Sequence, residues 1–174
     1  MKKVLVIGSG GAGKSTFAKR LSEKTGLEVI HLDQLYWQPN WVETPKDEWQ
    51  EIVKEIIEGD EWILDGNFGG TMEMRIEACD TVIFLEMPRT VCVYRILKRV
   101  AKYRNKTRPD MAKGCNEKFD FKFFGWIWNF EQTTKPRIEK LLKKFQNEKT
   151  IIRLKSKHEV EKFFAHYSEN SVLK

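Results

Sequence analysis

Short apolar runs rich in Val, Ile and Leu recur along this chain and alternate with longer segments in which apolar residues return every three or four positions. The first run, residues 3–7, is apolar without interruption, which is typical of a strand covered on both faces. Because strands that alternate with helices form parallel sheets, the pattern predicts an α/β fold with a five-stranded parallel sheet. The other four strands are predicted at residues 28–32, 61–64, 81–86 and 150–154.

The segments between these runs predict amphipathic helices. Residues 15–24 follow the first strand and carry apolar residues on one face. Thr44 and Pro45 favour a helix start with Thr44 as the N-cap residue, and Gly59 marks the end of that helix. Further helices are predicted from Pro88 onward and at residues 121–130, 136–146 and 156–166.

Helical periodicity is lost between about residues 103 and 120, where the polar sequence predicts a long loop or lid at approximately residues 100–122. Loops this long inside a compact domain are usually functional or disordered. The positive charge is concentrated in the same region. The whole chain carries a net charge of +6, whereas residues 89–122 carry +8 and residues 1–88 carry −7. Such a local excess indicates a local binding device rather than a uniformly basic surface.

Length and composition indicate one folded domain. The 174 residues are 41% hydrophobic and 32% charged, and no linker or repeat divides them, so we expect a single domain over residues 1–174. No apolar run is long enough for a membrane span or a signal peptide. Three cysteines without a C-x-x-C pair favour reduced thiols, and we therefore expect a cytoplasmic protein.

A glycine-rich loop joins the first strand to the first helix and matches the P-loop pattern G-x-x-x-x-G-K-[S/T]. Its backbone N–H groups and the start of the helix would cradle the phosphates of ATP. Lys14 would reach the β and γ phosphates, Ser15 would bind Mg²⁺ and Thr16 would contact the α phosphate. A dinucleotide-binding loop explains the sequence less well, because Lys14 and Ser15 have no role in one. The predicted nucleotide-binding residues are Gly8, Ser9, Gly10, Gly11, Ala12, Gly13, Lys14, Ser15 and Thr16.

Two aspartates stand at the ends of predicted strands, where the carboxyl ends of a parallel sheet face the ligand crevice. Asp33 follows the second strand and Asp65 ends the third. We expect Asp33 to serve the acceptor side as general base or substrate ligand, and Asp65 to hold Mg²⁺ through water. The two roles could be exchanged.

Together these residues resemble the P-loop small-molecule kinases related to adenylate kinase, shikimate kinase and gluconate kinase. The chain most closely resembles the bacterial group often called DNA topology modulation proteins, which is described as adenylate-kinase-related. This resemblance implies a five-stranded parallel sheet in the order 2-3-1-4-5, phosphoryl transfer from ATP, and a lid over the nucleotide. Besides the P-loop, it rests on His31-Leu32-Asp33, Asp65-Gly66-Asn67-Phe68, Tyr94-Arg95 through Arg99, Arg108-Pro109-Asp110-Met111 and Ile152-Arg153-Leu154.

The basic segment has a physical reason to exist in such an enzyme, because positioned arginines stabilise the charge that develops during phosphoryl transfer. Arg95 and Arg99 lie four residues apart on one helix and would project together toward the lid, where Arg108 follows. We expect Arg95 and Arg99 to be catalytic and Arg108 to bind the nucleotide. Arg153, in the fifth strand, is a candidate to flank the adenine.

The predicted acceptor side lies between the second and third strands, where the relatives hold the phosphate acceptor. Its candidate substrate-binding residues, besides Asp33, are Tyr36, Trp37, Asn67 and Arg75. We expect an ATP- and Mg²⁺-dependent kinase of a small molecule, such as a nucleotide, a sugar or a shikimate-like acid. Two alternatives stay open: a nucleotide-binding regulator that binds DNA through its basic segment and nearby aromatic residues, and an ATPase without an acceptor.

Overall fold

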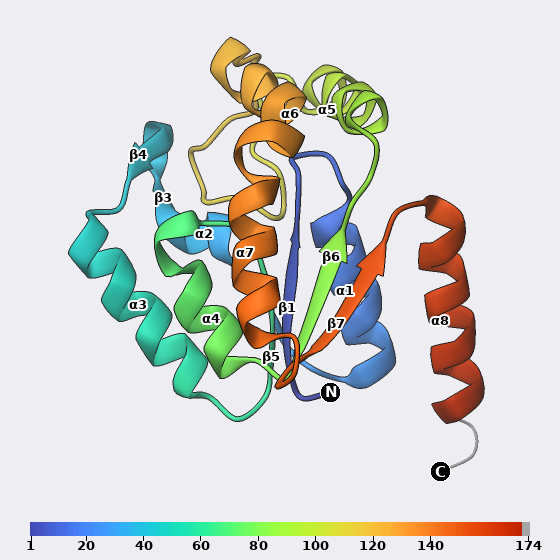
Figure 1. Ribbon diagram of the computed structural model, residues 1–174. Coiled ribbons are helices and arrows are strands. Elements are labelled where there is room, and N and C mark those ends of the chain that lie inside the picture. The colour runs from blue at the N-terminus through green and yellow to red at the C-terminus, as the bar shows by residue number, and fades with distance from the viewer. Residues whose placement is uncertain (172–174) are drawn as a thin grey trace.

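A five-stranded parallel sheet forms the centre of the protein, as the computed structural model of residues 1–171 shows (Figure 1). The strand order is β2-β5-β1-β6-β7, which is the predicted 2-3-1-4-5 when the strands of this sheet are counted along the chain. The α/β prediction is therefore confirmed. The strands are β1 (Lys3–Gly8), β2 (Val29–His31), β5 (Trp62–Asp65), β6 (Thr81–Leu85) and β7 (Thr150–Leu154).

Helices cover both faces of the sheet (Figure 1). One face carries α1 (Lys14–Thr25) and α8 (Lys157–Ser171), and the other carries α3 (Lys46–Glu58), α4 (Met72–Ala78) and α7 (Lys135–Phe145). Successive residues of β1 point to opposite faces, so Val4 and Val6 join the first apolar cluster while Leu5 and Ile7 join the second. This two-sided burial explains why the strand is apolar at every position.

Three further helices and a small hairpin surround the carboxyl ends of the strands (Figure 1). The helices are α2 (Leu32–Tyr36), α5 (Arg89–Tyr103) and α6 (Phe121–Thr133). The hairpin pairs β3 (Trp37–Gln38) with β4 (Val42–Glu43) around a short 3₁₀ turn, Pro39–Trp41, and a second such turn, Gly69–Thr71, precedes α4. The structure thus places loops and short elements at the edge where ligands bind in α/β sheets.

Three predicted details differ in the structure. The second strand ends at His31, because Leu32 already begins α2. Thr44 does not cap α3: its hydroxyl donates to the Tyr36 carbonyl oxygen at 2.6 Å, and Pro45 occupies the N-cap position. Helix α4 was not predicted, because its seven residues are too few for a clear helical period.

Residues 104–120, which we call the lid segment, connect α5 to α6 and fall within the predicted lid. The lid segment folds back on itself through bridges between Arg104 and Glu117 and between Thr107 and Asn116. It also docks on α2, since Gln34 Nε2 donates to the Pro109 carbonyl oxygen at 2.6 Å. The lid segment is therefore held beside the second strand.

The three cysteines are free thiols buried in the protein, as the sequence predicts. Within residues 1–171, none of the helices combines the length and the apolar character needed to cross a membrane.

Candidate active site

The loop between β1 and α1 has the compact curl of a phosphate-binding loop. Gly8, Gly11 and Gly13 all have positive φ angles, of 148°, 76° and 100°. A side chain at Gly8 would lie 2.5 Å from the Leu85 carbonyl oxygen, so the loop can pass β6 this closely only with glycine. No side chain caps the start of α1, which leaves its first N–H groups available to an anion.

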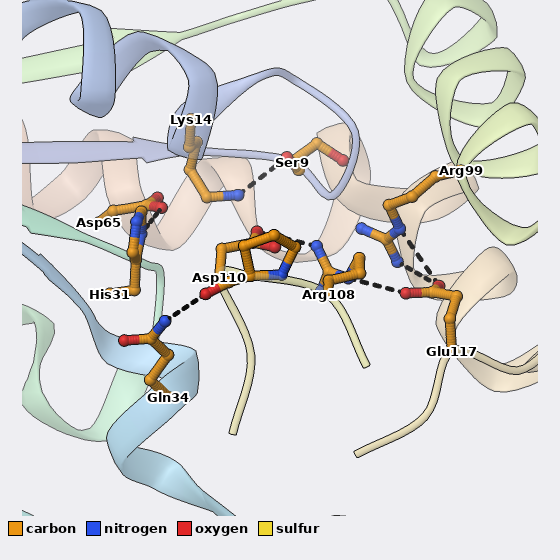
Figure 2. Close-up of polar contacts among 10 residues, drawn as sticks. Ser9, Lys14, His31, Gln34, Asp65, Arg99, Arg108, Asp110 and Glu117 are labelled. Atoms are coloured by element: carbon orange, nitrogen blue, oxygen red, sulfur yellow. Dashed lines mark hydrogen bonds and ion pairs between the residues drawn. The ribbon is translucent and has the colours of Figure 1, made fainter. Parts of the chain in front are cut away.

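Polar groups of this loop have weak or local partners that a phosphate could replace. Ser9 Oγ is buried, and its polar neighbour is the Cys92 thiol, a weak hydrogen-bonding group. Lys14 Nζ donates within the loop, to the Ser9 carbonyl oxygen at 3.2 Å (Figure 2). A methyl group added at Gly13 would meet Arg95 Nη1 at 3.5 Å, so a cation stands beside the loop. The loop therefore fits the phosphates of a nucleotide.

Arg95 is held directly against the P-loop. Its Nη1 donates to the carbonyl oxygen of Ala12 at 2.9 Å, with a longer contact to that of Gly11 at 3.4 Å. Helix α5 therefore places a cation beside the first turn of α1, next to Lys14. This position agrees with the predicted role in phosphate binding, which stays a prediction.

Asp65 and His31 form a pair at the adjacent ends of β5 and β2. The two residues are partners in the sheet register, and His31 Nδ1 lies 2.9 Å from Asp65 Oδ2 (Figure 2). Asp65 is only 5% exposed, and its hydrogen bond to His31 raises the pKa of the imidazole. His31 was not selected from the sequence as a site residue. The strand register was the signal that could have revealed it.

Asp33 lies in the first turn of α2 and shares this region. Burial raises the pKa of its carboxyl group, Lys14 opposes that shift, and the charge of Asp65 adds to it. The raised pKa makes the Asp33 carboxylate a more effective proton acceptor, whereas the Asp65 carboxylate is hydrogen-bonded to His31. This contrast favours Asp33 as the base and Asp65 as the metal-side carboxylate, an assignment that remains a prediction.

We expect the His31 imidazole to titrate above its ordinary pKa of about 6.5. Because its folded-state pKa is raised, the stability contributed by the pair is complete below about pH 6.5 and is lost as the pH rises through the folded-state value. NMR titration of the ring protons measures this directly. Asp65→Asn should lower the His31 midpoint, whereas Asp47→Asn, at an exposed position in α3, is the matched control and should leave it unchanged.

The lid segment contributes a buried cluster of charges that faces the P-loop (Figure 2). Glu117, which is 4% exposed, accepts from Arg99 Nη2 at 2.9 Å and forms an ion pair with Arg108 Nε at 2.8 Å. Arg108 Nη1 also donates to Asp110 Oδ2 at 2.9 Å. The structure therefore brings the predicted Arg99 and Arg108 together, and Glu117 is the residue that joins them. No role for Glu117 was predicted from the sequence.

Removing the Glu117 carboxylate should destabilise the protein, because it leaves the Arg99 guanidinium without its counter-charge and Arg108 with Asp110 as its remaining carboxylate partner. Loss of one partner from a buried ion pair costs about 3–5 kcal/mol, so Glu117→Gln should lower the free energy of unfolding by about 3 kcal/mol. Urea denaturation measures the change. Glu148→Gln, at an exposed position after α7, is the matched control and should change stability by less than about 0.5 kcal/mol. Equal stability of the two variants would show that the cluster is not a structural element.

The expected substrate contact of Arg75 is wrong, since its side chain is fully buried and bonded to the backbone. It donates to the carbonyl oxygens of Gly66 at 2.9 Å and Phe68 at 2.8 Å, and also to those of Thr71 and Asn67. Arg75 therefore fixes the loop that follows β5. The burial of Arg75 could not be predicted from the sequence, because a single charged residue in a short helix does not show which way its side chain faces.

The Asn67 side chain likewise forms hydrogen bonds to the backbone. Its Nδ2 donates to the Gly8 carbonyl oxygen at 2.7 Å, and its Oδ1 accepts from the Gly8 N–H at 3.1 Å. The loop after β5 is thus tied to the start of the P-loop, and the predicted substrate contact of the half-buried Asn67 stays a prediction.

Arg153 is engaged away from the predicted adenine position. Its guanidinium makes two hydrogen bonds of 2.6 Å to Glu139 of α7 and lies 3.5 Å from Glu86. These contacts link β7 to α7 on one face of the sheet. The role of Arg153 beside adenine is therefore not supported by its observed partners.

Tyr36 and Trp37 belong to an aromatic group beside α2. The ring of Tyr36 lies 4.6 Å from that of Phe68 and 5.1 Å from that of Trp49, between ring centroids. Trp37 lies 5.0 Å from Tyr36 and 5.5 Å from Trp41. Tyr36 is thus mainly a packing residue, whereas Trp37 and Trp41 lie at the outer part of the group and are half-buried.

Comparison with known proteins finds similarity to adenylate kinases. No family model matches the chain. The adenylate kinases of Thermotoga neapolitana and Thermotoga maritima are 31% and 32% identical to it over 109 residues, which cover 61% of this chain and 49% of each relative. The chain thus spans about half the length of these curated relatives.

The fold has a counterpart among solved structures. The structure of deoxyadenosine kinase from M. mycoides with products dCMP and a flexible dCDP bound has a TM-score of 0.50 at 15% identity, covering 95% of this chain and 98% of that one. The fold and the loop between β1 and α1 together define a P-loop α/β protein. The sequence similarity to adenylate kinases agrees with this class.

Proposed function

We propose that this protein is an ATP-dependent phosphotransferase that moves the γ-phosphoryl group of ATP to a small-molecule acceptor. One observation carries this proposal: Lys14 of the P-loop, Asp65 and the Arg99–Glu117–Arg108 cluster lie in one region (Figure 2), and the charges of Lys14, Asp65 and Arg108 all act on the buried Asp33 carboxyl group. Phosphoryl transfer needs a phosphate cradle, a proton acceptor and cations around the transferred group. The P-loop, the Asp33 carboxylate and the arginines would supply these three parts.

Each residue then has a defined task. The loop N–H groups and Lys14 would bind the β and γ phosphates, and Arg95, Arg99 and Arg108 would stabilise charge on the phosphoryl oxygens. Asp33 would accept the proton of the acceptor hydroxyl. Oxygen donors suit Mg²⁺, and the Ser15 hydroxyl with the Asp65 carboxylate, through water, would hold it. When bound, Mg²⁺ supplies additional neutralisation of the β and γ phosphate oxygens.

We further infer that residues 1–174 act as one kinase domain with the lid segment as its closing element. The lid segment supports this inference, because it carries Arg108 and contacts the hairpin region through Trp41, whose Nε1 donates to the Asn116 carbonyl oxygen at 3.0 Å. The group name suggested by the resemblance, DNA topology modulation, is not needed to explain these contacts.

The alternative of a DNA-binding regulator has less support. In its favour, Phe119, Phe121 and Trp128 are 46%, 81% and 47% exposed on the outer side of α6 and the lid segment. Against it, Arg99 and Arg108 of the basic segment point inward to Glu117, where they cannot reach a duplex. These two cations therefore serve the interior cluster rather than a polymer, whereas the lysines of the same segment are exposed.

Asp33→Asn separates binding from chemistry and tests the proposal. The variant should bind Mg-ATP within about threefold of the wild type by calorimetry, because the P-loop is intact. Its ADP release, measured with a mixture of nucleosides, sugars and small acids, should fall by about 10²-fold or more, as expected for loss of a general base. Asp47→Asn, at an exposed position in α3, is the matched control. Unchanged ADP release in Asp33→Asn would contradict the assignment of the base.

A further inference from the structure

We propose that the phosphate acceptor is electrically neutral: a hydroxyl-bearing ring compound of the nucleoside or sugar type, rather than a nucleoside monophosphate or a carboxylic acid. This inference rests on the proposed function and names the substrate class of the same site. The cations available on the acceptor side carry the argument, and the aromatic residues there support it.

In the proposed function, the acceptor side is the part of the chain between β2 and β6. This part has few cationic side chains that could bind an anion. Residues 28–87 contain only Lys46, Lys54 and Arg75 besides His31. Arg75 is buried and its donors bind backbone carbonyl oxygens. Lys54 is exposed on α3 and pairs with Glu51 at 2.5 Å, and Lys46 is exposed in the first turn of the same helix. Arg75 is thus occupied by the backbone, and the two lysines lie on the surface, so none of the three is placed to bind an anion at the site.

The other cations of the site are either paired with carboxylates or assigned to the phosphates of ATP. His31 pairs with Asp65, and Arg108 lies between Asp110 and Glu117 (Figure 2). In the proposed function, Lys14 and the lid arginines bind the phosphates of ATP. A second phosphate group, on the acceptor, would find no unpaired cation among these residues.

The charged side chains around the acceptor would be mainly carboxylates. Asp33 forms no ion pair with another side chain of residues 1–171, and the charges of Asp65 and Asp110 both act on its carboxyl group. Placing like charges side by side in a partly buried crevice is costly. A hydroxyl group, in contrast, can donate a hydrogen bond to a carboxylate. The crevice therefore selects a neutral hydroxyl over an anion.

The aromatic residues indicate a ring-shaped acceptor. Trp37 and Trp41 lie 5.5 Å apart between ring centroids, and both are half-buried at the rim beside α2. Flat aromatic faces pack against nucleobases and sugar rings without requiring charge. Trp41 also contacts the lid segment, so an acceptor packed against it would lie beneath the closed lid.

The transfer step balances with such an acceptor. The hydroxyl oxygen forms a bond to the γ phosphorus while the bond from that phosphorus to the β–γ bridging oxygen breaks, and its electron pair leaves with ADP. The hydroxyl proton passes to the Asp33 carboxylate. The products are a phosphate monoester and ADP.

Matched pairs of acceptors test the inference on the full chain with Mg-ATP. Adenosine is compared with AMP, deoxyadenosine with dAMP, and glucose with glucose 6-phosphate, and shikimate represents the acids. The phosphorylated product is measured by mass spectrometry. We expect the neutral member of at least one pair to be phosphorylated with a kcat/KM about 100-fold above that of its anionic partner. Which pair responds distinguishes a nucleoside from a sugar.

Two variants sharpen the test. Trp37→Ala should raise the KM for the neutral acceptor without changing the affinity for ATP, and Lys46→Ala should leave both within about twofold, as an exposed position predicts. Preference for an anionic acceptor, or loss of acceptor binding in Lys46→Ala, would overturn the inference while leaving the proposed kinase function intact. Failure to phosphorylate any compound, with ATP binding still dependent on Lys14, would overturn the proposed function and the inference with it.

Discussion

Replacing Lys14 with Ala should nearly abolish ATP binding and remove phosphoryl transfer. Lys14 supplies the cation of the P-loop, and its Nζ, now bonded to the Ser9 carbonyl oxygen at 3.2 Å, is free to move to a phosphate. Loss of one positioned donor to a developing oxyanion costs about 10²- to 10³-fold in rate, and loss of a charged one should cost at least as much. Calorimetry with Mg-ATP and an ADP-release assay measure the two effects.

Lys19→Ala is the matched control for Lys14→Ala. Lys19 lies on the same helix, α1, but is exposed, so its removal should change neither ATP affinity nor rate by more than about twofold. Thermal unfolding of both variants shows whether the fold is intact. If Lys14→Ala bound ATP as tightly as Lys19→Ala does, the P-loop would not be the nucleotide site.

Arg75→Met should cause the largest loss of stability among single substitutions near the site. The Arg75 guanidinium binds carbonyl oxygens of the loop after β5, and methionine would leave these buried acceptors unpaired. Each unsatisfied buried group costs about 1–3 kcal/mol, so the free energy of unfolding should fall by about 3–5 kcal/mol in a urea titration.

A second readout distinguishes local from global damage in Arg75→Met. Because Asn67 connects the loop after β5 to Gly8, ATP affinity should fall even at temperatures where the variant remains folded. Arg137→Met removes an exposed arginine of α7 and should leave stability and affinity unchanged within error. A loss below about 1 kcal/mol in Arg75→Met would contradict the structural role of the guanidinium.

The features that the sequence predicted well depend on local signals. The P-loop is contiguous, and β1 is apolar at every position because it is covered on both faces. The alternation of strands and helices led to the correct fold class, and the resemblance led to the correct strand order. Such signals survive in a single sequence because each lies within one stretch of chain.

The features that were missed depend on residues brought together by folding. Glu117 meets Arg99 from 18 positions away, and His31 meets Asp65 from 34 positions away, only once strands and lid are in place. Arg75 was interpreted as a substrate ligand because a buried arginine and an exposed one look the same in sequence. Thr44 was interpreted as a cap, but the nearby Tyr36 carbonyl oxygen takes its hydroxyl. Tertiary context overrides local preference at each of these positions.

A crystal structure with Mg²⁺ and a non-hydrolysable ATP analogue tests the central claim most directly. We expect the triphosphate in the loop between β1 and α1, with the γ phosphate within hydrogen-bonding distance of Lys14 Nζ and the Arg99 and Arg108 guanidinium groups facing it. Asp33 should lie on the open side of the γ phosphate, where an acceptor would stand. A nucleotide bound elsewhere, or an empty P-loop at saturating analogue, would contradict the proposed phosphotransferase.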